Sequence, residues 1–443
     1  MRGDGEGLSV ELTEHIGGIN ADLTVGVNVA ATEPLKSNLR VSNTGVKLHG
    51  MGFIVTPHQA ANLGFGKVDE IESHIRPYKT GRDLAQSPRD LKVIDLFGLE
   101  IAGVRERFPE IYQWILERVK PERDQNNRAI YRDRWWIFGE PRSDFRPALK
   151  GLQKFIATAR TAKHRVFAFL LINTLVESEV VTIALDDAYF LGVLSSHIHV
   201  TWALATGSTL EDRPRYNTSR CFDPFPFPDC DEVKKARVRE LGEALDAHRK
   251  RQQAAHPSLT ITDMYNVLEK LRAGVALSER ERRTHELGLV SILQQLHGDL
   301  DAGVADAYGW PVALSDADIL ARLVELNAVR AAEERAGRVR WLRPEFQHPA
   351  GRATQTALDT GTAPDTMPIA ATSTRRDKLP WPKTVPEQAR AVRQALAACG
   401  GVTTPAELAG TFSRARVRAV EELLQTLAAL GQAREVEAGR YVA

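Results

Sequence analysis

A basic stretch, residues 118–165, holds the side chains of this sequence with the clearest chemical potential. It contains thirteen Lys and Arg against five Asp and Glu, a local excess of eight positive charges in a 443-residue chain whose formal net charge is +1. Lys and Arg neutralise phosphates, and planar rings lie against bases or sugars. The aromatic residues interleaved with these cations are Tyr131, Trp135, Trp136, Phe138, Phe145 and Phe155. The stretch predicts a nucleic-acid surface. The alternative is a solvated basic face over a core that buries Trp135 and Trp136.

A second polar segment, residues 211–220 (EDRPRYNTSR), has the chemistry of a base reader. In the major groove, Arg makes paired hydrogen bonds to guanine, and Asn makes them to adenine. The residues that could do so are Arg213, Arg215, Asn217 and Arg220. The run 222–228 (FDPFPFP) follows, and its alternating prolines predict a rigid extended connector that could hold the segment in place. The alternative is a polar turn between a helix and a linker.

Sequence motifs for catalysis are missing. The chain has no GxxxxGK[ST] loop, and the GxG pairs at 50–52 and 64–66 lack the rest of a dinucleotide fingerprint. Methylation of a base amino group uses an Asn- or Asp-Pro-Pro-aromatic turn around the extruded base, and this sequence has no Pro-Pro dipeptide. Asp187 is interpreted as a helix N-cap rather than as half of an acid pair with Asp186. We therefore expect no catalytic, metal-binding or cofactor-binding residue in this chain.

The composition predicts a soluble cytoplasmic protein. Hydrophobic residues make up 43% of the chain and charged residues 26%, with no apolar run long enough to span a membrane and no apolar segment near the first residue. The three cysteines are odd in number and sparse, which is typical of a reducing compartment.

The order of predicted elements gives an α+β protein of several domains. The predicted parts are a mixed α/β domain (1–228), a helical domain (229–347), a flexible linker (348–383) and a small winged-helix-like domain (384–443). The predicted strands include 8–12, 46–56, 91–97, 166–172 and 180–185. Helix is expected over 100–119, broken at Pro109, and over 187–205, broken near Ser195 and Ser196. Thr384 and Thr404 each precede a Glu by three residues and predict capping boxes, and Gly431 predicts a helix stop.

With these residues in view, the chain resembles the C-terminal half of the MmeI-like (type IIL) DNA methyltransferases of restriction-modification and phage-defence systems. The resemblance rests on the order and spacing of residues 74–78 (HIRPY), 81–83 (GRD), 188–196 (AYFLGVLSS), 215–217 (RYN) and 225–228 (FPFP). It covers roughly residues 15–347, and the winged-helix-like part lies outside it.

The resemblance implies a function for the first part of the chain. In such proteins a methyltransferase domain that binds S-adenosylmethionine precedes a target-recognition domain. The resemblance therefore implies that residues 1–228 recognise double-stranded DNA for an adenine-N6 methyltransferase, and that S-adenosylmethionine binds a methyltransferase domain or subunit outside this chain. The chain is then a separate specificity subunit or a fragment, inactive alone. The other hypothesis is a protein–protein adaptor of a defence complex. The residues predicted to bind DNA are Arg82, Arg123, Arg128, Arg132, Arg134, Arg142, Lys163, Arg213, Arg215, Asn217 and Arg220.

Overall fold

The computed structural model describes residues 27–210, 213–349, 379–382, 385–399, 403–413, 415–429, 433–437 and 439–442. The chain divides into two units, Met1–Gly361 and Thr362–Ala443. Each unit has its own hydrophobic core, as expected of a chain too long for one core. No helix among the described residues is long and apolar enough to cross a membrane.

A four-stranded sheet, here called the base sheet, lies in the first unit. Its order is β1-β8-β5-β6, and all neighbouring strands are antiparallel. The strands are β1 (Ser42–Thr44), β5 (Lys154–Ala159), β6 (Phe167–Leu171) and β8 (Val180–Ile183). All four residues of β8 are buried, and all four are β-branched, the type that packs best on a covered sheet. The predicted strands at 166–172 and 180–185 are therefore confirmed.

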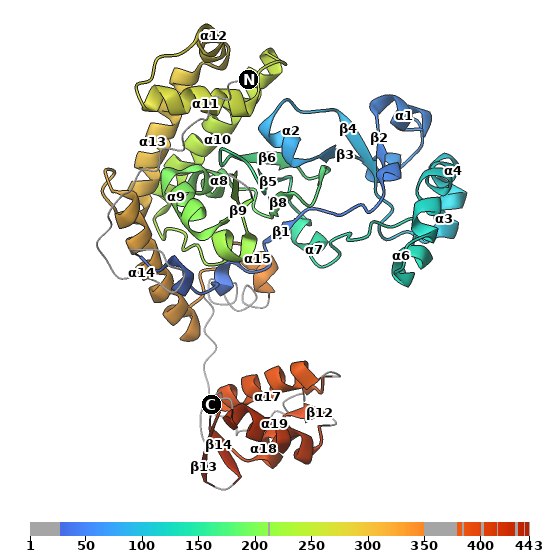
Figure 1. The fold of residues 1–443 in the computed structure, drawn as a ribbon, viewed down its shortest axis with the longest axis vertical. Helices are drawn as coiled ribbons and strands as arrows, with labels where there is room; N and C mark the ends of the chain where they lie inside the picture. The colour runs from blue at the N-terminus through green and yellow to red at the C-terminus, as the bar shows by residue number, and fades with distance from the viewer. Residues whose placement is uncertain are drawn as a thin grey trace, which may run out of the picture. The chain divides into compact units, whose positions relative to one another are not determined.

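Helices cover one side of the base sheet (Figure 1). They are α8 (Ala188–Ser195), α9 (His197–Thr206), α10 (Glu232–Ala255), α11 (Ile261–Arg272), α12 (Glu279–Gly288), α13 (Val290–Tyr308), α14 (Asp316–Arg335) and the short α15 (Pro344–Gln347). Asp187 caps α8 by accepting a hydrogen bond from the Tyr189 amide at 2.9 Å, as predicted. Ser196 separates α8 from α9 and caps the second helix through the His199 amide, which confirms the predicted break.

Two glycines allow α8 and α10 to touch through their backbones. A Cβ on Gly242 of α10 would lie 2.5 Å from the carbonyl oxygen of Ala188, and one on Gly192 of α8 would lie 2.9 Å from the carbonyl oxygen of Val238. Both distances are too short for a real Cβ. Gly192, within the segment 188–196, is therefore needed for α8 to pack closely against α10.

The proline-rich run 222–228 belongs to the core and is not an exposed connector. Phe222 and Phe225 have no solvent exposure. The Asn38 side-chain amide donates to the carbonyl oxygens of Phe222 (2.9 Å) and Phe225 (2.7 Å), and Asn327 of α14 donates to a further carbonyl of the run at 2.7 Å. Buried carbonyls need such donors. The sequence predicted a rigid segment but not its burial, and residues on both sides of 228 share one core.

A lobe of residues 48–138, here called the inserted lobe, interrupts the chain between β1 and β5. It has a second sheet of order β2-β4-β3-β7, in which β7 comes from the β6–β8 connection and pairs in parallel with β3. The strands are β2 (Ile54–Val55), β3 (Ile75–Lys79), β4 (Leu91–Ile94) and β7 (Leu175–Val176), and the helices are α1 (Pro57–Asn62), α2 (Gly81–Ala85), α3 (Ile101–Arg107), α4 (Pro109–Arg118), α5 (Lys120–Asp124) and α6 (Ala129–Asp133). Figure 1 shows the α1, α3, α4 and α6 end of this lobe away from the helical layer.

The entry to and exit from the inserted lobe lie side by side. The backbones of Lys47 and Glu140 exchange hydrogen bonds of 3.1 and 3.0 Å, and the Lys47 ammonium contacts the Glu140 carboxylate at 2.7 Å. The chain then forms the short α7 (Arg146–Leu149) and enters β5. The lobe is thus tied to the rest of the unit at a two-chain neck and by β7. The Arg76 guanidinium also donates to the Ile172 carbonyl oxygen, and the Thr262 hydroxyl of α11 donates to the Ala85 carbonyl oxygen of α2.

One predicted strand in this lobe is wrong over most of its length. Within 46–56 only Ile54 and Val55 form a strand, because Met51–Phe53 makes a 3-10 turn. Gly52 lies against the next helix: a Cβ there would be 2.6 Å from the Arg118 carbonyl oxygen, so the chain turns where only glycine fits. The predicted helix at 100–119 is confirmed with its break, since α3 ends at Arg107 and α4 starts at Pro109.

The second unit has the element order expected of a winged helix. It contains α17 (Val385–Cys399), α18 (Pro405–Gly410), α19 (Val417–Ala429) and a hairpin of β13 (Arg434–Glu437) and β14 (Arg440–Val442), with a short parallel pair of β11 (Leu379–Pro380) and β12 (Phe412–Ser413). The capping box at Thr404 is present. The predicted strand 8–12, most of the linker, Thr384 and Gly431 lie outside the described residues.

Candidate nucleic-acid interface

The aromatic residues of the basic stretch do not face solvent. All six are buried, with exposures between 1% for Phe155 and 9% for Tyr131. Trp135 and Trp136 meet edge to face with ring centroids 6.2 Å apart, and the Trp136 indole donates to the carbonyl oxygen of Leu99 at 2.9 Å. The idea that these rings stack on bases is therefore wrong, and the alternative of a core beneath a basic face is correct for them.

Arg123 is also buried, which corrects its assignment as a DNA contact. It is 1% exposed, and its Nη2 donates to the carbonyl oxygens of Leu48 (2.7 Å) and Ile137 (3.1 Å) at the neck of the inserted lobe. Burial lowers the pKa of its guanidinium, because the charged form loses hydration. Arg123 holds backbone segments together, and a phosphate cannot reach it.

Arg142 is half-buried and bound to β1. Its Nη2 donates to the Thr44 hydroxyl and its Nε to the Gly45 carbonyl oxygen, both at 2.8 Å, and it pairs with Glu140 at 2.8 Å. Hydrogen bonding from Lys47, with the nearby charge of Arg142, lowers the pKa of the Glu140 carboxyl. Since all of its donors are directed inward or to Glu140, Arg142 is better described as a brace between the neck and β1 than as a phosphate contact.

Three predicted arginines do face solvent together, around α6. Arg128, Arg132 and Arg134 are exposed. The Arg128 guanidinium contacts the Tyr131 hydroxyl at 3.2 Å, and Arg132 donates to the Asn126 carbonyl oxygen at 2.6 Å, so both side chains are positioned by local bonds. This trio of the basic stretch is placed where it can contact phosphates.

Two other predicted contacts are exposed but lie on separate elements. Arg82 of α2 donates to the Gln86 side chain at 3.0 Å. Lys163 contacts Asn266 (2.7 Å) and Glu269 (3.2 Å) of α11. Because the Glu269 carboxylate already pairs with the Lys163 ammonium, Lys163 would bind a phosphate less strongly than an unpaired lysine would. The structure does not bring these two residues into the group around α6.

The predicted reader segment borders a hollow of about 400 Å³, here called the polar hollow. Its lining residues are Ser42, Asn43, Thr44, Arg160, Tyr216, Asn217, Thr218, Ser219, Arg220 and Asp223. They come from β1, an edge strand of the base sheet, from the end of β5, and from the π-helical turn Thr218–Phe222 with its flanks. Hydroxyl, amide and guanidinium groups thus converge at an open sheet edge.

Several polar atoms at and beside the polar hollow are buried without a partner. They are the hydroxyl oxygens of Ser42, Thr161 and Thr218 and the Nε of Arg215. Buried polar groups are normally hydrogen-bonded, so these four atoms are spare hydrogen-bonding capacity at and beside the polar hollow. The polar hollow is therefore built to receive hydrogen-bonding groups.

A short hairpin carries Arg213 and Arg215 to this region. β9 (Ser208–Leu210) pairs with β10 (Arg213–Arg215) in an antiparallel register, and residues two apart in a strand share a face. Arg213 is exposed, while Arg215 is half-buried. Because Arg213 and Arg215 lie in an extended strand, their side chains are on the same face of it. Asn217 follows, and its amide nitrogen donates to the Ser208 hydroxyl at 2.8 Å.

The side chains beneath the hollow are rigidly held. The Tyr216 hydroxyl lies 3.0 Å from His199 Nε2, and both residues are buried. Burial lowers the pKa of His199 to about 3, so this imidazole is neutral at physiological pH. Burial also raises the pKa of Asp223 to about 7, which removes much of the negative charge that a carboxylate would otherwise place in the hollow.

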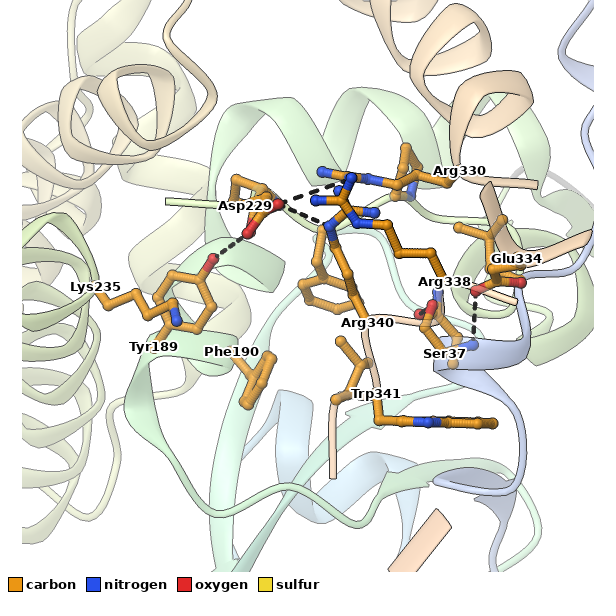
Figure 2. Close-up of a pocket in the computed structure, with 16 residues that line it drawn as sticks. Ser37, Tyr189, Phe190, Asp229, Lys235, Arg330, Glu334, Arg338, Arg340 and Trp341 are labelled. Carbon is orange, nitrogen blue, oxygen red and sulfur yellow. Dashed lines mark hydrogen bonds and ion pairs between the residues drawn. The ribbon is translucent and has the colours of Figure 1, made fainter. Parts of the chain in front are cut away.

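A second cavity, of about 160 Å³, is lined by many charged groups that are already paired (Figure 2). Arg340 donates to Asp229 at 2.7 Å and also binds Glu333, while Arg330 approaches Asp229 at 3.8 Å. Glu334 accepts from the Ser37 amide at 2.9 Å. These bonds tie α14 and the segment after it to Ser37 and to Asp229, the residue that follows the proline-rich run, so the cavity is a structural junction. The described residues contain no group of His, Cys, Asp or Glu that could hold a metal ion.

Sequence reasoning missed the other wall of the polar hollow. Ser42, Asn43 and Thr44 stand more than 100 residues before Arg160, and only the pairing of β1 and β5 with β8 brings them together. The polarity of an edge strand in an otherwise apolar sheet was the one available clue.

The part of the chain that forms the base sheet and the polar hollow is similar to known proteins. Residues 31–229 match the family model of the MmeI target recognition domain. This part of the chain is therefore similar to the MmeI target recognition domain, and the predicted resemblance is confirmed.

The relatives are longer proteins. A segment of 95 residues, 21% of this chain, is 28% identical to DNA methyltransferase A of Bacillus subtilis (strain 168), and covers 10% of that protein. The solved structure of the type IIL restriction-modification enzyme MmeI in complex with DNA matches 71% of this chain with a TM-score of 0.55 and 18% identity. The chain spans 39% of the length of that MmeI chain.

Proposed function

We propose that the first unit recognises a specific sequence in double-stranded DNA for an adenine-N6 methyltransferase of a restriction-modification system. The observation that carries the proposal is the polar hollow, where the predicted reader segment meets an edge strand with unpaired buried polar groups. Support comes from the matching family model and from the DNA-bound state of the similar MmeI structure.

Two groups of residues divide the work in this proposal. Arg128, Arg132 and Arg134 neutralise phosphates and fix the register of the protein on the duplex. Arg213, Asn217 and Arg220 present hydrogen-bonding groups to base edges, since paired donors and acceptors distinguish bases in the major groove. Burial raises the pKa of the Asp223 carboxyl to about 7, so this residue places less negative charge beside the DNA than an ordinary carboxylate would.

The methyl donor belongs to another domain or subunit. S-adenosylmethionine carries a positive sulfonium, and the polar hollow presents the cations Arg160 and Arg220 with Asp223 as its one acid. These residues suit an anionic or neutral polar ligand rather than that cofactor. The proposal therefore places methyl transfer on a methyltransferase partner, and this chain supplies the recognition of the site.

The test is selection from a randomised duplex pool by the purified full chain, followed by affinity measurements between 50 and 200 mM salt. We expect one enriched motif. The triple variant Arg128→Gln, Arg132→Gln, Arg134→Gln should retain the motif while the salt slope falls by about 2.7, because each phosphate contact contributes about 0.9. Over a fourfold salt change these contacts account for about a 40-fold difference in affinity.

The matched control is the triple variant Arg280→Gln, Arg282→Gln, Arg283→Gln on α12. It removes the same charge from another exposed surface and should leave the slope unchanged. Equal slopes for the two triple variants would remove the α6 arginines from the interface. Absence of any enriched motif, with binding of a separately expressed methyltransferase instead, would replace DNA reading by the adaptor function.

A further inference from the structure

An exposed apolar side chain stands in the middle of the α6 arginines. Ile130 is 57% exposed, although it belongs to a helix whose next residue, Tyr131, is buried. Phe97, 38% exposed, lines the same hollow of about 400 Å³ together with Ile130 and Arg134. Exposing a large apolar group costs free energy in water, so covering Ile130 and Phe97 would favour binding.

The neighbouring charges indicate what covers this apolar shelf of Ile130 and Phe97. Residues 128–134 carry three exposed arginines against the single acid Asp133. A protein partner would have to neutralise this charge as well as cover the apolar groups. A DNA duplex supplies phosphates for the arginines and an apolar surface, the faces of its stacked bases, for Ile130.

The shelf is held firmly enough to act on a stiff ligand. The Arg146 guanidinium lies 4.4 Å from the Phe97 ring centroid, and Arg146 makes two hydrogen bonds to Asp95, at 2.8 and 3.0 Å. Asp95 is 4% exposed, so this brace is buried. The Trp136 ring forms another part of the hollow wall and is fixed by its bond to the Leu99 carbonyl oxygen.

The shelf is also joined to the polar hollow. Pro141 and Ser143 line the same hollow as Ile130 and Phe97. Arg142, which lies between them in the sequence, donates to Thr44, which lines the polar hollow. The two hollows are therefore connected through Arg142, and one bound duplex could contact both.

We infer that Ile130 is a wedge that enters the minor groove and partly unstacks one base step, so that the bound DNA is bent. This inference rests on the proposed function and adds a second mode of recognition to it. Apolar wedges flanked by cations kink duplexes by on the order of 20–90°. Pyrimidine–purine steps deform most readily, so the wedge selects such a step without hydrogen bonds to its bases.

The test measures bending of a duplex carrying donor and acceptor dyes at its ends, with the motif obtained by selection at its centre. The wild-type chain should bring the dyes together. Ile130→Ala should lose most of this change and the preference for a pyrimidine–purine step, while its salt slope stays at the wild-type value. Ile130→Gln, which keeps the length of the side chain but not its apolar character, should behave like Ile130→Ala. Val233→Ala, at a 79% exposed position on α10, is the matched control and should bend DNA normally.

The outcomes separate this inference from the proposed function. Sequence-specific binding to a straight duplex, or full bending by Ile130→Ala, overturns the wedge and leaves DNA recognition intact. Loss of specific binding by the wild-type chain itself overturns both. If Ile130→Ala bends DNA normally but no longer associates with a separately expressed methyltransferase, the shelf is a protein-docking surface and the wedge is refuted.

Discussion

The contact between α8 and α10 gives a sharp stability prediction. Gly242→Ala adds a methyl group whose carbon would lie 2.5 Å from the Ala188 carbonyl oxygen and 3.0 Å from the Gly192 amide nitrogen. These are backbone atoms of another helix and cannot rotate away. Alanine gains about 1 kcal/mol over glycine in a helix interior, whereas overpacking of this kind costs typically about 1–3 kcal/mol and more when backbones must separate. We expect a net loss of about 1–3 kcal/mol in the free energy of unfolding of the first unit.

The matched control is Gly298→Ala on α13. Gly298 is exposed, and a Cβ there would have no atom within 4 Å, so only the helix preference remains. This variant should be more stable than the wild type by about 0.5–1 kcal/mol. Thermal unfolding of both variants, followed by tryptophan fluorescence, compares them directly. If Gly242→Ala were as stable as Gly298→Ala, the close approach of the two helices would be disproved.

Four further predictions concern the site and the basic stretch. Asp223→Asn should stabilise the protein by about 2–4 kcal/mol at pH 8 but little near pH 4. The carboxyl pKa is raised to about 7 in the folded protein, so the wild type loses stability as pH rises above the pKa of the unfolded chain. An equal difference in melting temperature between variant and wild type at every pH from 4 to 8 would contradict this. Arg123→Met should lower stability by about 1–3 kcal/mol by leaving carbonyl groups unpaired, yet leave the salt slope of the folded protein unchanged, which separates it from Arg132→Gln. Arg213→Ala and Asn217→Ala should relax the selected motif at single base pairs, at about 1–3 kcal/mol each, and uniformly weaker binding with an unchanged motif would move them to the phosphate class. The chain alone, given labelled S-adenosylmethionine and DNA, should transfer no methyl group, because the base-holding turn is absent from its sequence; clear incorporation would refute this.

Local signals in the sequence predicted local structure well. Pro109 lacks a backbone donor, and the helix breaks there. Asp187 and Thr404 have side chains suited to unpaired helix amides, and both form caps. In each case the deciding interaction joins residues within four positions of one another, so the sequence contains the whole of it.

Burial was the part that could not be predicted. Trp135, Trp136 and Arg123 have the residue types of a nucleic-acid surface, but all three are buried, and the two tryptophans belong to the core of the inserted lobe. The proline-rich run shows the same effect, since its burial depends on Asn38 and Asn327, which are distant in sequence. For the polar hollow, the sequence predicted the residues from Arg213 to Arg220. It did not predict the wall formed by β1, because that wall depends on the order of the strands in the base sheet.

The neck of the inserted lobe has a consequence for how recognition could diversify. Because the strands at Lys47 and Glu140 are already paired, the ends of any segment placed between them are held together by the rest of the protein. Changing the length of such a segment alters closure entropy only slightly, by about 0.6 kcal/mol per doubling. Changes of length within residues 48–138 should therefore cost little closure entropy, and under the proposals above they would alter the wedge and the phosphate contacts while the polar hollow stays in place. A replacement would need an edge strand that, like β3, accepts Leu175 and Val176, and partners for the outside contacts that Arg76, Ala85 and Asp95 make.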